Sequence, residues 1–214
     1  MSASASVVPH HETRFRSKKV KVAIDCKNEN PGPLDYSFYK LSNLSDIYDE
    51  EPRIVSPRKE TTQEKTEKEK SPGRCLRLNN NQLSDLKLLP EIVGNLFENP
   101  SSLGWLDLSF NEITTIDPVL AEFENLHILY LHGNGIADLK HVEQLTPLKN
   151  LWKLTLHGNP IDSVKGYRFS VLSLLPWLHN LDFSAVTKGD QVTARVLSKM
   201  NGPPKKKKKE ETDD

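Results

Sequence analysis

The chain has 214 residues, with 29 Lys and Arg against 29 Asp and Glu, so its formal net charge is zero. A neutral chain has no overall field to attract a polyanion, which excludes charge-driven binding by the whole molecule. Two cysteines are too few for a disulfide framework and suit a reducing compartment. No stretch approaches the roughly 20 apolar residues of a membrane span. These features predict a soluble, cytoplasmic protein.

The core must lie in the middle of the chain. Of 29 leucines, 25 fall between Leu76 and Leu181, and the other 108 residues hold four. Residues 1–30 carry six basic and three acidic side chains without a hydrophobic period, which predicts a disordered basic segment.

Residues 31–48 resemble a weak copy of the repeat that follows. Leu34, Tyr36, Leu41 and Leu44 have the offsets of that repeat, but Tyr39 stands where an Asn is expected. Two interpretations are open. The segment is a degenerate repeat that caps the apolar end of the array, or it becomes ordered on a partner. The next residues, 49–72, are charged and nearly free of apolar side chains, which predicts a disordered linker.

Residues 73–187 contain an internal repeat. Four segments fit L-x-x-L-x-L-x-x-N-x-L, and their asparagines are 30, 23 and 25 residues apart. The paired leucines point to one side of a short strand, and each Asn can bond the backbone where the chain turns. We predict an asparagine ladder that consists of Asn81, Asn111, Asn134 and Asn159. Because one repeat buries little by itself, the units must stack.

These residues identify an α/β leucine-rich repeat solenoid, right-handed, with short parallel strands on its concave face and disordered flanks. The expected strands are 76–78, 106–108, 129–131, 154–156 and about 181–183, and 90–99 and 188–200 are expected to be helices. The segment 166–187 (GYRFSVLSLLPWLHNLDFSAVT) resembles the C-terminal cap of the intracellular subfamily with short repeats. That subfamily includes a protein-phosphatase-1 regulatory subunit, the spliceosomal A-prime protein and an axonemal dynein light chain.

The C-terminal segment 188–202 is predicted to be a helix, because Thr187 and Asp190 form a capping-box pattern. Val192, Val196 and Met200 share one face, which either packs on the last coil or remains free for a partner. The tail 203–214 is predicted to be disordered. Its run Lys205–Lys209 is either a nuclear import or polyanion-binding element or a solvated tail, and the four acidic residues that follow favour the solvated tail.

The outward strand positions form columns on the concave face, because stacked coils keep their register. An apolar patch of Trp105, Phe110, Ile128 and Tyr130 is expected there, with a polar fringe. Aromatic side chains on a rigid scaffold are typical binding anchors. The alternative is that the N-terminal segment of the chain itself covers them. The predicted partner-binding residues are Trp105, Asp107, Phe110, Ile128, Tyr130, His132, Lys153 and His157.

Chemistry is not expected at this face. His132 and His157 stack on adjacent coils, but no third ligand joins them, so neither a metal nor another cofactor is predicted. Catalytic motifs are missing, and the family resemblance implies binding. We expect a non-enzymatic protein-protein scaffold without membrane contact, and the dynein resemblance implies a cilium or axoneme as one setting. The alternatives are a nuclear or RNA-complex adaptor that uses the basic tail and, third, a phosphatase regulatory subunit.

Overall fold

The computed structural model describes residues 32–53 and 70–201. Its centre is a sheet in which the strands follow one another in chain order, the first six parallel and the last pair antiparallel. The strands are β1 (Leu34–Asp35), β2 (Cys75–Arg77), β3 (Trp105–Asp107), β4 (Ile128–Tyr130), β5 (Lys153–Thr155), β6 (Asn180–Leu181) and β7 (Ser184–Ala185). The predicted leucine-rich repeat solenoid is confirmed.

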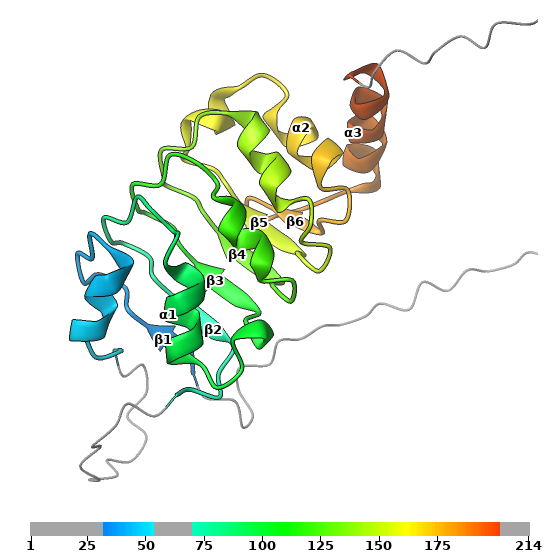
Figure 1. Cartoon of the computed structure of the whole chain (residues 1–214). Helices are drawn as coiled ribbons and strands as arrows, with labels where there is room; N and C mark the ends of the chain where they lie inside the picture. Colours follow the sequence, from blue (N-terminus) through cyan, green and yellow to red (C-terminus); the bar gives the residue numbers. More distant parts are fainter. Residues whose placement is uncertain (1–31, 54–69, 202–214) are drawn as a thin grey trace, which may run out of the picture.

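Short helices connect the strands and cover the opposite, convex side, in front of the sheet in Figure 1. The 3₁₀ helices are η1 (Leu44–Asp49), η2 (Pro100–Ser102), η3 (Pro118–Glu122), η4 (Leu139–Leu145) and η5 (Pro160–Ser163). The α-helices are α1 (Leu89–Leu96), α2 (Tyr167–Leu174) and α3 (Lys188–Asn201). The helix expected at 90–99 ends earlier, since Phe97 is buried and forms a parallel β-bridge with Ser71.

The register places equivalent leucines side by side through the whole array. Leu76 is paired with Leu106, Leu106 with Leu129, and Leu129 with Leu154, which is paired in turn with Leu181. All five side chains are fully buried. The strands begin one residue earlier than predicted, and their leucines point inward as expected.

The asparagine ladder connects each coil to the one before it. Asn111 donates from Nδ2 to the carbonyls of Leu78 and Leu108, both at 3.0 Å, and its Oδ1 accepts from the Leu83 N–H at 3.1 Å. Asn81, Asn134 and Asn159 make the same set of bonds one coil apart. Each amide therefore satisfies backbone groups that the turn would leave buried without partners.

The segment after residue 31 forms the first coil of the solenoid. Leu34 is paired with Leu76, and Tyr36 donates its N–H to the Arg77 carbonyl at 2.9 Å. Tyr36, Leu41, Leu44 and Ile47 are buried. Tyr39 lacks the amide of the other coils, so the ladder ends at Asn81, whose Oδ1 accepts from the N–H groups of Tyr39 and Leu41. The segment covers the leucines of the second coil, as a cap would.

The two ends of the expected linker lie against the solenoid. Arg53 donates its N–H to the Asp35 carbonyl at 2.7 Å, and its guanidinium lies 4.9 Å from the Tyr39 ring centre. Lys70 Nζ donates to the Gly94 carbonyl at 2.7 Å. The rest of the linker, the expected disordered segment 1–30 and the tail 203–214 lie outside the described residues.

The last coil departs from the predicted strand at 181–183. The backbone of Asp182 and Phe183 is left-handed, with φ of 52° and 61°, and turns the chain back into β7. A carboxylate holds this turn, because Asp182 Oδ1 accepts from the N–H groups of Leu156 at 2.7 Å and His157 at 2.9 Å. The carboxylate therefore accepts from an N–H that in earlier coils bonds a carbonyl of the next coil, as the Leu131 N–H bonds the Thr155 carbonyl.

Helix α3 begins with a capping box and is attached to α2. Thr187 Oγ1 accepts from the Asp190 N–H at 3.1 Å, and Asp190 Oδ2 accepts from the Thr187 N–H at 2.9 Å. Arg168 of α2 donates to the same carboxylate oxygen at 2.9 Å. These bonds, with that of Arg168 as the largest cause, lower the pKa of Asp190 to about 2. Ala194 is buried, and Val192, Val196 and Met200 are exposed.

We expect Leu131→Ala to lower the free energy of unfolding by about 2–5 kcal/mol, because Leu131 is fully buried in the middle coil and truncation leaves a cavity. Leu88→Ala is the matched control, since Leu88 is 45% exposed and its truncation should change stability by less than about 0.5 kcal/mol. Urea unfolding measures both changes. An equal loss of unfolding free energy in the two variants would contradict the burial of Leu131.

We expect acid to release α3. The Asp190 pKa is lower in the fold than its ordinary value of 3.8, so its stabilising contribution is complete above that value and is lost as pH falls through about 2. Hydrogen exchange of the α3 amides, corrected for the intrinsic rate, should show falling protection below about pH 4. Asp190→Asn should remove that pH dependence, and an unchanged dependence in the variant would assign it to another group.

Candidate protein-binding surface

The concave face is formed by the outward side chains of the parallel strands. One row runs across β2 to β6 and contains Cys75, Trp105, Ile128, Lys153 and Asn180. A second row runs across β2 to β5 and contains Arg77, Asp107, Tyr130 and Thr155. The structure therefore brings Trp105, Ile128, Tyr130 and Lys153 to one face, whereas Cys75, Asp107 and Thr155 of the same rows are buried.

Aromatic rings from four coils meet on this face. Trp105 packs edge-on against Tyr130, with ring centres 6.1 Å apart, and Tyr130 packs against His132 at 5.9 Å. His132 and His157 are stacked at 4.7 Å with nearly parallel rings. We define the aromatic cluster as Trp105, Phe110, Tyr130, His132, His157 and Phe183. It joins the predicted residues into one contiguous patch.

Phe183 completes the cluster and was missed by the prediction. Its ring lies 5.5 Å from that of Tyr130 and 5.6 Å from that of His132. In the repeat pattern Phe183 occupies the position of the buried Leu156, so a regular coil would point it inward. The left-handed turn at Asp182 and Phe183 directs it outward instead. The signal in the sequence was the lack of an Asn three residues after Phe183.

Three exposed phenylalanines share an unusual backbone. Phe38, Phe110 and Phe183 have φ of 62°, 53° and 61° and are 58%, 52% and 58% exposed. Later coils place glycine at the position of Phe110, and a Cβ on Gly133 would come within 2.6 Å of the Phe110 ring. A bulky residue in this region carries a strain of about 1–2 kcal/mol. Strain and exposure at the same side chains point to a functional surface.

The residues of the expected polar fringe differ in their exposure to solvent. Asp107 is only 7% exposed, because its carboxylate accepts from the N–H of Ser109 at 3.0 Å and from its hydroxyl at 2.6 Å. It stabilises the turn, so we do not count it among the contact residues. Lys153 and Ile128 are half-buried beside the cluster, and none of the described residues forms an ion pair with Lys153.

The two stacked histidines are held from the inner side. His132 Nδ1 is 2.8 Å from Thr155 Oγ1, and His157 Nδ1 is 3.3 Å from Asp182 Oδ1. Burial, followed by the neighbouring His157, lowers the pKa of His132. Within 32–53 and 70–201, no three His, Cys, Asp or Glu side chains are grouped as metal ligands. The lowered pKa favours the neutral form of His132 within the cluster.

Two hollows on the described surface lie toward the first coil. One of about 710 Å³ separates the first coil from α1 and is lined by residues such as Tyr36, Tyr48 and Leu96. Another of about 380 Å³ lies between Phe38 and Phe110. In the described part of the chain, helices are too short or too polar to cross a bilayer.

Comparison with known proteins agrees with this architecture. The leucine-rich repeat family profile matches residues 75–209. Leucine-rich repeat-containing protein 51 of Rattus norvegicus is 50% identical over 175 residues, which cover 81% of this chain and 88% of that protein. The probable U2 small nuclear ribonucleoprotein A' of Caenorhabditis elegans is 34% identical over 104 residues, 48% of this chain and 41% of that protein.

A solved structure has the same fold. A chain in the crystal structure of the Drosophila melanogaster SNF/U2A' complex superposes with a TM-score of 0.57 at 23% identity, covering 81% of this chain and 92% of that one. At this identity the likeness shows the fold alone. The family profile covers more than half of the chain, and the match to the rat relative covers 81% of it. The chain therefore belongs to the leucine-rich repeat family and groups within it with leucine-rich repeat-containing protein 51.

Proposed function

We propose that this protein is a non-enzymatic scaffold that binds another protein through the aromatic cluster on its concave face. The observation that carries the proposal is the combination of exposed rings and strained backbone at Phe110 and Phe183. A fold gains little by holding phenylalanine in a left-handed conformation and exposing it to water. A partner that covers both rings would compensate for the strain.

The scaffold beneath the cluster is rigid enough to act as a preformed site. Each strand is bonded to its neighbours, and the turn after each strand is held by the asparagine ladder. Trp and Tyr provide a large contact area with few rotatable bonds, so little entropy is lost when they bind. Tyr130 lies in the middle of the cluster, where water is most completely excluded in a complex.

The charges around the cluster favour a partner with an apolar surface and a small number of acidic groups. At one side, Arg77 is already paired with Asp35 at 3.0 Å. At the other, Lys153 is half-buried and free of ion pairs among the described residues. A carboxylate on the partner would form an ion pair with Lys153, next to the apolar contact with the aromatic cluster. The chain's own N-terminal segment, residues 1–31, is the competing occupant of this face.

A second candidate function is that of an adaptor in a nuclear ribonucleoprotein. The 34% identity to the nematode ribonucleoprotein A' favours it, and the name of the Drosophila complex shows that a protein of this fold assembles with another protein. RNA affinity that falls steeply with salt would support an adaptor that contacts phosphates directly. Cytoplasmic and axonemal localisation belong to the main proposal and are tested by imaging the tagged protein in ciliated cells. A phosphatase subunit ranks third.

We expect Trp105→Ala and Tyr130→Ala each to weaken partner binding by about 2 kcal/mol or more, which is roughly 30-fold. Tyr48→Ala is the matched control, because Tyr48 is an exposed tyrosine near α1 on the convex side. Purified partners from affinity capture, measured by calorimetry, provide the affinities. If the variant that combines Trp105→Ala and Tyr130→Ala is folded and binds every partner with wild-type affinity, the binding surface lies elsewhere.

We expect Phe110→Asn to separate stability from binding. Asn80 occupies the same position one coil earlier with φ of 58°, and Asn tolerates this conformation better than Phe. The free energy of unfolding should therefore stay within about 1 kcal/mol of the wild type, because relief of strain offsets the lost contact with His132. Binding should weaken at least about 5-fold. A large loss of stability would instead make Phe110 a structural residue.

A further inference from the structure

Helix α3 carries three apolar side chains on the face away from the protein. Val192, Val196 and Met200 are 58%, 52% and 76% exposed, whereas Ala194 is buried and Leu197 is half-buried. A helix whose only task is to cover the end of a solenoid would have the opposite arrangement. Figure 1 shows α3 at the end of the array, with its outer side away from the strands.

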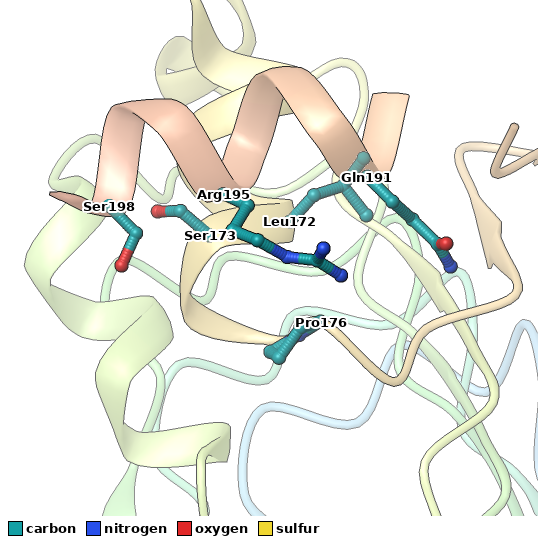
Figure 2. A pocket seen from close by; sticks show the side chains of 6 residues that line it. All are labelled: Leu172, Ser173, Pro176, Gln191, Arg195 and Ser198. Carbon is teal, nitrogen blue, oxygen red and sulfur yellow. The ribbon is translucent and has the colours of Figure 1, made fainter. Parts of the chain in front are cut away.

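A row of positively charged side chains flanks this apolar stripe. Lys188, Arg195 and Lys199 follow one another at intervals of seven and four residues, so they form a row beside the valines. All three are exposed, and none of the described residues forms an ion pair with them. In Figure 2 the Arg195 side chain leaves α3 and extends over a hollow of about 270 Å³ above Pro176.

The helix has no acidic group to balance this row. Its single carboxylate, that of Asp190, is bound by Arg168 of α2 at 2.9 Å. The outer side of α3 therefore combines an apolar stripe at i, i+4 and i+8 with an adjacent row of three cations that form no ion pair within the described residues. Such a stripe fits the ridge of a second helix.

We propose that the outer face of α3 is a second docking site, separate from the concave face, for an amphipathic helix of a partner protein with acidic residues beside its apolar stripe. A second copy of this chain does not fit, because it would place three cations against three. A membrane surface fits less well, since the face lacks the Trp, Phe and Leu side chains of interfacial helices. Phosphate binding alone would leave the apolar stripe uncovered.

The test uses the full chain and two labelled synthetic amphipathic helices of about 18 residues, about five turns. Both have the same leucine stripe; one has Glu and the other Lys beside it. Fluorescence anisotropy measures their affinities. We expect the Glu peptide to bind at least about 10-fold more tightly than the Lys peptide and to weaken as salt rises.

Variants then locate the site. The double change Val192→Ser and Val196→Ser should weaken the Glu peptide about 10-fold or more, and Arg195→Gln with Lys199→Gln about 5-fold or more. Lys140→Gln, at an exposed lysine in η4, and the concave variant Trp105→Ala should each change the affinity less than about 2-fold. Circular dichroism should show every variant folded, because the changed α3 side chains are exposed.

Three results would overturn the proposal. Equal affinity for the Glu and Lys peptides would remove the role of the cations. Binding that survives the α3 changes but is lost in Trp105→Ala would assign the peptide to the concave face. Co-sedimentation with vesicles of phosphatidylcholine and phosphatidylserine, lost in the α3 variants and without peptide binding, would make the face a membrane contact.

Discussion

A single coil of this chain has no way to bury its own leucines, and the rest of the structure depends on that constraint. The leucine side chains become inaccessible only when the next coil lies on them. Stacking brings peptide groups into the interior at every turn, where an unpaired N–H or C=O is unfavourable. The side chain of Asn111 resolves the conflict by bonding two carbonyls and one N–H across two coils. The leucines thus make stacking favourable, and the asparagines make it possible without unpaired groups.

The ends of the array show what happens when the ladder stops. At the N-terminal end, Tyr39 has no side-chain amide to continue the bonds, and Arg53 closes the coil by donating its N–H to the Asp35 carbonyl and lying against the Tyr39 ring. At the C-terminal end, the carboxylate of Asp182 accepts from the N–H groups of Leu156 and His157, where the next coil would otherwise continue, and the chain reverses. That reversal exposes Phe183 and brings it to the rings of Tyr130 and His157. The device that ends the fold therefore also builds part of the candidate binding surface.

The two proposed surfaces differ in how they would recognise a partner. The aromatic cluster lies on strands that are bonded on both sides, so it is preformed and its specificity comes from shape. The outer face of α3 is joined to the array chiefly through α2 and the Arg168–Asp190 pair, and it offers a narrow apolar stripe beside cations. Such a surface selects partners by charge and is sensitive to salt. The surfaces lie on different elements, so both could be occupied at once in an assembly.

The sequence by itself determined the solenoid, the inward leucines, the asparagine positions and the capping box at Thr187. Each of these features depends on residues within one repeat or one helical turn. The periodicity of the sequence reveals such short-range relations directly. Only the tertiary structure decided that Asp107 faces a buried turn, that Phe183 points outward and that α3 turns its valines to solvent. These outcomes depend on the rotation of one element against another and on a left-handed turn. Both are set by packing between residues far apart in the chain, which a local pattern does not contain.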